Sequence, residues 1–221
     1  EDASLVSRRC WSDQYVYELE KKGIFGKAWL FLGHESQIRN PGDFVQAYMC
    51  ETPIILARGS DGKVHANVNS CTHRGLPVCR ADHGNAKRFV CPYHSWSYTV
   101  EGDLVTIPQE SEVCNKPDKS QLGLKKVPRV ESWRGLIFGS FDEEIIPLED
   151  YLGDMRFYLD AFLDRFPGGI EFMGAPHRWV LNANWKLPVE NQLGDVNHGA
   201  FLHAAIIPRE AQALIEELGY S

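Results

Sequence analysis

Short apolar runs separated by turn residues fill most of the chain between residues 29 and 140. Turn-forming sequences such as Asn40-Pro41-Gly42 and Asp61-Gly62 interrupt these runs, and such residues favour the tight turns of hairpins. The pattern predicts an antiparallel β domain rather than a helical one. The strands that it predicts are residues 29–32, 44–49, 53–57, 64–68, 88–91, 96–100, 127–130 and 136–140.

Two segments outside this region show helical spacing instead. Residues 13–27 repeat apolar side chains on one face and predict a helix that Gly23 ends. Residues 148–166 predict a single amphipathic helix, which a Pro-Gly-Gly sequence then ends. Further along, we expect short strands at residues 171–173 and 178–181 and a helix after residue 186.

These sequence patterns predict an α+β chain of three parts. Residues 1–28 form an N-terminal helical segment, residues 29–146 form the antiparallel β domain, and residues 147–221 begin a second domain. The chain shows no internal repeats, and at 43% hydrophobic residues it can form a packed core.

Two short motifs inside the predicted β domain each contain one cysteine and one histidine. Cys71-Thr-His73 is followed, after seventeen residues, by Cys91-Pro-Tyr-His94. Two thiolates and two imidazoles are the ligands of a Rieske [2Fe–2S] cluster, in which the cysteines hold one iron and the histidines the other. Because imidazole is neutral, the histidine-bound iron accepts an electron more easily, so the pattern indicates an electron-transfer site.

Two alternatives remain for these four residues. They could close a tetrahedral structural zinc site, or their spacing could be a coincidence. Zinc sites of this composition usually pair like with like along the chain, whereas here each motif supplies one cysteine and one histidine. Gly75, Pro77 and Pro92 flank the ligands, as expected where tight loops bring backbone amides close to a cluster.

Composition and charge exclude some classes of protein. The net charge of −7 argues against a nucleic-acid-binding protein. No apolar run approaches eighteen residues, so no membrane span is expected. The four remaining cysteines have no paired spacing, and we expect reduced thiols and a cytoplasmic location. They are Cys10, Cys50, Cys79 and Cys114.

Basic residues gather in and between the two cysteine-histidine motifs despite the acidic total. They are either a solvated surface or a patch that steers an acidic electron donor such as a ferredoxin. The residues concerned are Arg74, Arg80, Lys87 and Arg88, followed later by Lys125, Lys126 and Arg129.

A second candidate site lies between residues 190 and 203. Two histidines and one carboxylate form the facial triad of non-haem Fe(II) oxygenases, and this segment contains Asp195, His198 and His203. The two histidines lie about 140° apart on an ideal helix, so the segment must kink to bind one metal. In an arbitrary chain, two such histidines are more often surface or packed residues.

Together the motifs resemble the large (α) subunits of ring-hydroxylating dioxygenases, in the naphthalene-type branch. Cys-x-His-Arg-Gly and Cys-x-Tyr-His-x-Trp carry this resemblance at the first site, and Asn184-Trp185-Lys186 with the histidines carries it at the second. The resemblance implies an antiparallel Rieske domain followed by a mixed α/β, helix-grip-like catalytic domain, to which residues 1–28 also belong.

The resemblance also implies a role for each candidate residue. Cys71, His73, Cys91 and His94 would bind the cluster, and His198 and His203 would bind a mononuclear Fe(II). Asp195 would bridge this iron site to His94 of a neighbouring subunit, and Asn191 would lie near the iron. The third iron ligand, an Asp, is expected beyond Ser221, so the chain would be the N-terminal half of a longer polypeptide.

The activity implied is that of a terminal oxygenase which converts an aromatic ring and O2 into a cis-dihydrodiol. Electrons would come from NAD(P)H through a separate reductase and a ferredoxin. The implied assembly is a trimer of α subunits, with or without small β subunits (α3β3). The alternatives are a Rieske monooxygenase, such as a salicylate hydroxylase or demethylase, and a non-catalytic Rieske electron carrier.

Overall fold

A computed structural model describes residues 5–112, 118–174 and 176–193 of the 221. The chain divides into two compact units, each described by itself. One contains residues 19–177, and the other combines residues 1–18 with residues 178–221. The cysteine-histidine motifs belong to the first unit.

The larger unit is built from three antiparallel sheets, which confirms the predicted β domain. Sheet A has the order β1-β10-β9, sheet B the order β4-β3-β2-β5, and sheet C the order β6-β7-β8. Sheet A contains β1 (Leu30–His34), β9 (Arg129–Trp133) and β10 (Leu136–Ser140). Sheet B contains β2 (Asp43–Met49), β3 (Thr52–Arg58), β4 (Val64–Val68) and β5 (His83–Asn85). Sheet C contains β6 (Phe89–Val90), β7 (Ser97–Tyr98) and β8 (Leu104–Thr106).

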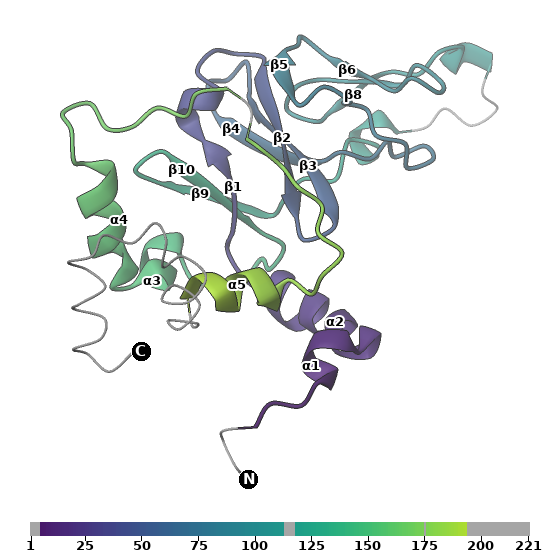
Figure 1. Ribbon diagram of the computed structural model, residues 1–221. Coiled ribbons are helices and arrows are strands. Elements are labelled where there is room, and N and C mark those ends of the chain that lie inside the picture. The colour runs from purple at the N-terminus through teal and green to yellow at the C-terminus, as the bar shows by residue number, and fades with distance from the viewer. Residues whose placement is uncertain (1–4, 113–117, 175, 194–221) are drawn as a thin grey trace. The chain divides into compact units, whose positions relative to one another are not determined.

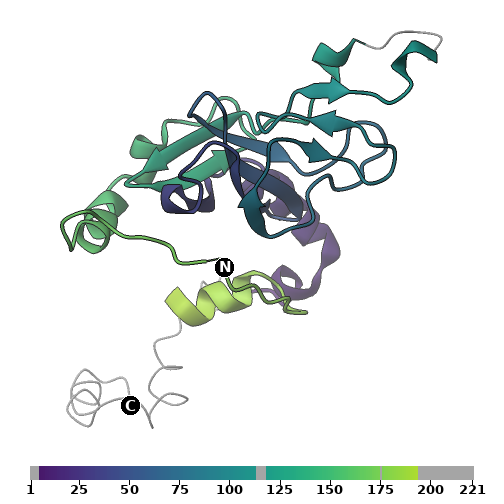
Figure 2. The same ribbon diagram turned by 90° about the horizontal axis from the view of Figure 1, so that it is seen from above.

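Sheet B lies between the other two sheets (Figures 1 and 2). Side chains alternate across its strands, so Phe44 and Ile55 join one core with residues of sheet C, whereas Val45 and Leu56 join a second core with residues of sheet A. The sequence pattern had identified all strands except β5 and β8, which are only three residues long. It had not indicated that β1 pairs with the distant β10.

The predicted helix near the N-terminus is present but continues past Gly23. It comprises α2 (Gln14–Glu20) and a π-helical turn, η1 (Lys21–Phe25), which Gly26 ends through a hydrogen bond from its N–H to the Lys21 carbonyl at 2.8 Å. Three 3-10 turns occur elsewhere in the larger unit: η2 (Glu35–Gln37), η3 (Glu110–Glu112) and η4 (Lys119–Gln121).

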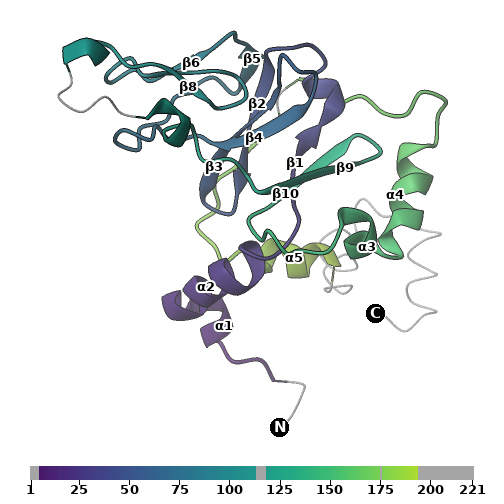
Figure 3. The ribbon, with the colours of Figure 1, turned by 180° about the vertical axis from the view of Figure 1, so that it is seen from behind.

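The single helix predicted at residues 148–166 is wrong, because Gly153 at φ +50° divides it into α3 (Leu148–Leu152) and α4 (Met155–Leu163). Both helices are labelled in Figure 3. Leu148 is buried, but Met155 and Phe162 are exposed. Polar contacts attach α4 to sheet A, where Asp160 accepts hydrogen bonds from Trp133 at 2.8 Å and from Arg134 at 3.2 Å.

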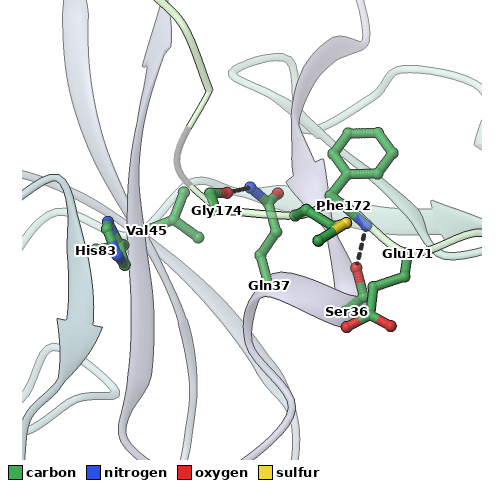
Figure 4. A pocket seen from close by; sticks show the side chains of 8 residues that line it. Ser36, Gln37, Val45, His83, Glu171, Phe172 and Gly174 are labelled. Carbon is green, nitrogen blue, oxygen red and sulfur yellow. Dashed lines mark hydrogen bonds between the residues drawn. The ribbon is translucent and has the colours of Figure 1, made fainter.

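The strands predicted at residues 171–173 and 178–181 are also wrong, since neither segment forms regular structure. Residues 171–174 attach to η2 through side chains instead (Figure 4). Phe172 donates its backbone N–H to Ser36 Oγ at 2.9 Å, and its ring stacks on the buried His34 at 4.8 Å. His34 is only 6% exposed.

The contacts of residues 171–174 border an open groove of about 370 Å³, with His83 at its other end (Figure 4). Its polar lining residues Ser36 and Gln37 are hydrogen bonded to the segment itself. The groove is therefore a feature of how this segment packs, and it lies apart from the four cysteine and histidine side chains.

The smaller unit contains α1 (Arg9–Ser12) and α5 (Lys186–Leu193), the latter in agreement with the predicted helix after residue 186. Lys186 extends its ammonium group over the ring of Trp11, 5.8 Å from the ring centre. Across the described residues, no helix is both long and apolar enough to cross a membrane. Cys10, Cys50 and Cys79 are free thiols, as expected, and Cys114 lies outside the described residues.

Candidate metal centre

The two cysteine-histidine motifs form loops that close in the same way. In loop 1 (residues 71–76), the Cys71 N–H donates to the Leu76 carbonyl at 2.9 Å and the Gly75 N–H donates to the Cys71 carbonyl at 2.7 Å. In loop 2 (residues 91–96), Cys91 and Trp96 form the first of these bonds at 2.8 Å, and Ser95 and Cys91 form the second at 3.0 Å. Each cysteine therefore starts a turn of identical hydrogen bonding.

The fifth residue of each turn adopts positive φ. Gly75 has φ +79° and Ser95 has φ +59°. Glycine adopts this conformation without steric cost, whereas an L-residue such as serine is strained in it. The second loop thus imposes the same backbone path without a glycine.

The imidazole rings of His73 and His94 converge, with their Nδ1 atoms 3.1 Å apart. A hydrogen bond between two Nδ1 atoms would require one ring to hold its proton there. Two nitrogens bound to one metal at about 2.0–2.1 Å each would lie roughly 3.0–3.4 Å apart, with neither protonated at that atom. The two imidazole nitrogens are therefore suitable ligands for one shared iron. Their separation of 3.1 Å already fits such a site.

The two cysteines lie deeper than the histidines. Cys71 and Cys91 are each 3% exposed and belong to the core between sheets B and C, whereas His73 is exposed and His94 half-buried. No three His, Cys, Asp or Glu side chains converge on one metal ion among the described residues, and a binuclear cluster needs only two protein ligands on each iron. A Rieske cluster requires this arrangement, in which the thiolate ligands are buried and the imidazole ligands lie nearer the surface.

Aromatic side chains flank both histidines. Trp96 stacks on His73 with ring centres 4.8 Å apart and planes 8° apart, and Tyr93 stacks on His94 at 3.8 Å. The Arg74 guanidinium lies 5.8 Å from the centre of the Tyr93 ring. These contacts fix the ring orientations, so the edge of each imidazole opposite Nδ1 is directed away from the partner histidine.

Burial and positive neighbours both disfavour protonation of His94. Desolvation lowers its pKa below the usual value, and the positive charges of His73 and Arg74 act in the same direction. A neutral imidazole is the form that binds a metal. The site is thus electrostatically suited to holding His94 as a ligand.

Tyr98 reaches from β7 to the first cysteine and is completely buried. Its hydroxyl lies 3.1 Å from Cys71 Sγ and accepts the Thr72 N–H at 3.3 Å. The Thr72 hydroxyl donates to the Leu122 carbonyl at 2.7 Å and lies 3.0 Å from the Tyr98 hydroxyl. The Tyr98 proton can therefore be donated to the Thr72 oxygen or to the Cys71 sulfur. Burial raises the pKa of Tyr98 to about 12, and the bond to Cys71 adds to the effect, so the phenol stays protonated.

The basic residues of the two motifs divide into two groups. Arg74, Arg80, Lys87 and Arg88 are exposed, and none of them forms an ion pair within the described part of the chain. Lys126 pairs instead with Asp103 at 3.1 Å, and Arg129 pairs with Glu131 at 2.6 Å. Only the first group supports a basic surface beside the loops.

The second candidate site is described only in part. Asn191 lies on α5 and is half-buried. Asp195, His198 and His203 lie outside the described residues. Their roles as bridge and iron ligands stay predictions.

Three side chains that the sequence did not single out contact loop 1 or the residues that follow it. They are Tyr98, described above, and the buried amides Gln46 and Asn69, which bond to the backbone after loop 1. A polar residue on a strand face expected to be buried was the available signal, and it applied to Gln46 on β2 but not to Asn69, which follows β4.

Comparisons with known proteins agree with this geometry. The family model for the Rieske [2Fe-2S] domain matches residues 28–128. The benzene 1,2-dioxygenase α subunit of Pseudomonas putida F1 is 41% identical over 198 residues, which are 90% of this chain and 44% of that protein. The crystal structure of naphthalene 1,2-dioxygenase from Rhodococcus sp. bound to indole superimposes with a TM-score of 0.85 at 43% identity, over 93% of this chain and 47% of that one.

A second similar structure comes from another class of oxygenase. A quaternary ammonium Rieske monooxygenase, solved with an inhibitor, has a TM-score of 0.77 at 27% identity, over 90% of this chain and 54% of that chain. The chain spans about half the length of the relatives that it matches.

The fold, the paired loops and the family match define a protein with a Rieske [2Fe-2S] domain. More narrowly, the chain is homologous to the N-terminal half of the large (α) subunits of ring-hydroxylating dioxygenases.

Proposed function

We propose that the chain is the cluster-bearing half of the α subunit of an aromatic-ring-hydroxylating dioxygenase. The observation that carries this proposal is the pair of Nδ1 atoms 3.1 Å apart at the tip of a domain homologous to such subunits. Cys71 and Cys91 would bind one iron, and His73 and His94 the other. Bound there, the cluster supplies reversible one-electron transfer.

The residues around the loops would serve electron entry. Arg74, Arg80, Lys87 and Arg88 add four exposed positive charges in and between the two motifs. Such a patch attracts an acidic protein and accelerates its association at low salt. A ferredoxin that is itself reduced by an NAD(P)H-dependent reductase is the donor that we propose.

The residues beyond α5 would serve electron exit and chemistry. We propose that His198 and His203 bind a mononuclear Fe(II), with a third Asp ligand beyond Ser221, and that Asn191 lies beside this iron. Asp195 would accept hydrogen bonds from an iron-bound histidine and from His94 of the neighbouring subunit in an α3 or α3β3 ring. A carboxylate between two metal-bound imidazoles orients both.

The reaction proposed is the addition of both atoms of O2 to an aromatic ring, giving a cis-dihydrodiol. It is tested by incubating the full-length oxygenase, ferredoxin and reductase with naphthalene, benzene or biphenyl under ¹⁸O2. A diol that contains two labelled atoms supports the proposal. Replacing Asp195 by Ala should leave both metals bound and abolish most of the product, and near-normal turnover would disprove the bridge.

A monooxygenase is the second candidate, and the similarity to the quaternary ammonium Rieske monooxygenase favours it. The same labelling experiment separates the two, because a monooxygenase product carries a single labelled atom. Formation of a mono-hydroxylated or demethylated product without any diol would replace the first proposal with the second.

A further inference from the structure

The connection that contains loop 1 crosses sheet B from one edge to the other. It leaves β4, which is one edge strand, and returns as β5, which is the opposite edge strand. Loop 2 instead joins β6 and β7, which are neighbours in a hairpin closed by Phe89 opposite Tyr98 and Val90 opposite Ser97. Loop 1 therefore lacks the ladder of hydrogen bonds that positions loop 2. Other contacts must hold loop 1 in place.

Asn69 and Gln46 provide these contacts on the face of sheet B that packs against sheet C. Asn69 follows β4 directly, is 2% exposed, and its Oδ1 accepts the N–H groups of Val78 at 2.9 Å and Cys79 at 3.0 Å. Its Nδ2 donates to the Cys79 carbonyl at 2.7 Å. One side chain thus joins the residue before loop 1 to the residues after it.

Gln46 on β2 extends the same network. Its Oε1 lies 3.4 Å from Asn69 Nδ2, and its Nε2 donates to the Ala81 carbonyl at 2.9 Å. Gln46 is 8% exposed. Buried backbone groups that lose their partners are costly, so the two amides determine where the chain around loop 1 can lie. Both are neutral, and their hydrogen bonds do not depend on pH in the working range.

We propose that Asn69 and Gln46 are the positioning residues of the cluster, which hold Cys71 and His73 in register with Cys91 and His94. They act through the backbone of residues 78–81. The proposal rests on the ligand set proposed above.

The test compares Asn69→Ala and Gln46→Met with Asn67→Ala in the holoprotein. Asn67 is a matched control because it is a 1% exposed amide on the neighbouring β4, yet its side chain contacts the Val100 carbonyl rather than residues 70–81. Cluster loss to an iron chelator should be about tenfold faster in Asn69→Ala than in the control, within the range for residues that support metal ligands. Gln46→Met should show a smaller increase, since the Asn69 bonds to Val78 and Cys79 remain.

Pulsed EPR of the reduced cluster gives a readout that general instability would not change. Two histidine nitrogen couplings are expected in the parent protein, and Asn69→Ala should alter the coupling of His73 while that of His94 is retained. Couplings and loss rates equal to those of Asn67→Ala, for both variants, would overturn the proposal. If Asn69→Ala fails to fold, Gln46→Met decides by the same two readouts. A parent protein without histidine couplings would instead refute the ligand set itself.

Discussion

The two cluster loops share one backbone design but depend on different parts of the molecule. Both close with the same pair of hydrogen bonds and a positive φ at the fifth residue. Loop 2 is the end of a hairpin, whereas loop 1 spans a four-stranded sheet. The comparison shows that equal local geometry can be specified by neighbouring residues in one loop and by distant side chains in the other.

The loops also place their histidines differently. His73 is the third residue of its turn and His94 the fourth of its own, yet their Nδ1 atoms meet at 3.1 Å. In the proposed ligand set, each iron would receive one ligand from each loop, and neither loop alone would hold a complete metal site.

The largest expected effect follows from this sharing. Replacing either His73 or His94 by Ala should abolish the cluster to the same extent, because each leaves one iron with a single nitrogen ligand. His83→Ala is the control, since His83 is an exposed histidine on β5 outside both loops. Iron and sulfide analysis with visible absorption measures the result. A cluster that survives in one variant only would show that the histidines are not equivalent ligands.

Tyr98 connects the loops, because it follows loop 2 in sequence and contacts Cys71 of loop 1. Donation of a hydrogen bond to a thiolate favours the more negative, reduced cluster. Tyr98→Phe should therefore lower the reduction potential by about 40–60 mV, equivalent to about 1 kcal/mol for one electron.

The potential of Tyr98→Phe is measured by redox titration, with Tyr158→Phe as control because Tyr158 is 65% exposed on α4. An unchanged potential in Tyr98→Phe would mean that its proton serves Thr72 rather than the sulfur. A fall in both variants would indicate a cause unrelated to the cysteine.

The fifth residues of the two turns should differ in how substitution changes the free energy of unfolding. Gly75→Ala should cost about 1–2 kcal/mol, because an L-residue at this φ is strained. Ser95→Gly should change the stability by less than about 0.5 kcal/mol, since relief of strain is offset by the greater freedom of unfolded glycine. Urea unfolding of both variants measures this, and equal losses would contradict the parallel between the turns.

Acid should weaken a contact of the β7–β8 turn and leave the amides beside loop 1 unaffected. Glu101, in the turn between β7 and β8, accepts the N–H and the hydroxyl of Ser60, both at 2.7 Å. Despite the opposing effect of desolvation, these bonds lower its pKa from 4.5 to about 2. A carboxyl whose pKa is lower when folded stabilises the protein above the unfolded pKa, and this contribution is lost as the pH falls from 4.5 through 2.

At pH 7, Glu101→Gln should therefore be about 1–2 kcal/mol less stable than the parent protein. The difference should shrink steadily when urea unfolding is repeated between pH 4.5 and 2. The amides that support loop 1 do not titrate, so Gln46→Met should show no such change. A difference for Glu101→Gln that stays constant with pH would contradict the lowered pKa.

Much of the sheet domain and the ligand set could be predicted because the signals are local. Strands of five to seven residues show their apolar pattern directly, and each cysteine lies within three residues of its histidine. The pairing of β1 with β10 could not be predicted, since it joins segments about a hundred residues apart. The division between α3 and α4 had a signal in Gly153 that was overlooked.

The side chains that contact or position the cluster loops could not be predicted from the sequence for a similar reason. Tyr98 lies 27 residues from Cys71, and Gln46 lies 23 from Asn69. A buried tyrosine or amide on a strand reads as a core position, and only the fold shows which carbonyl, N–H or sulfur it faces. The prediction of a strand at residues 171–173 was wrong because a strand-like sequence does not form a strand without a partner strand to pair with.

The central claim is that the two loops bring two imidazoles onto one iron and two thiolates onto the other. Low-temperature EPR of the dithionite-reduced holoprotein, with iron, sulfide and zinc analysis of the same sample, tests it most directly. The account predicts a rhombic signal whose average g lies below the free-electron value, with iron and sulfide in equal amounts from this domain. A silent spectrum with one zinc ion per chain would contradict it.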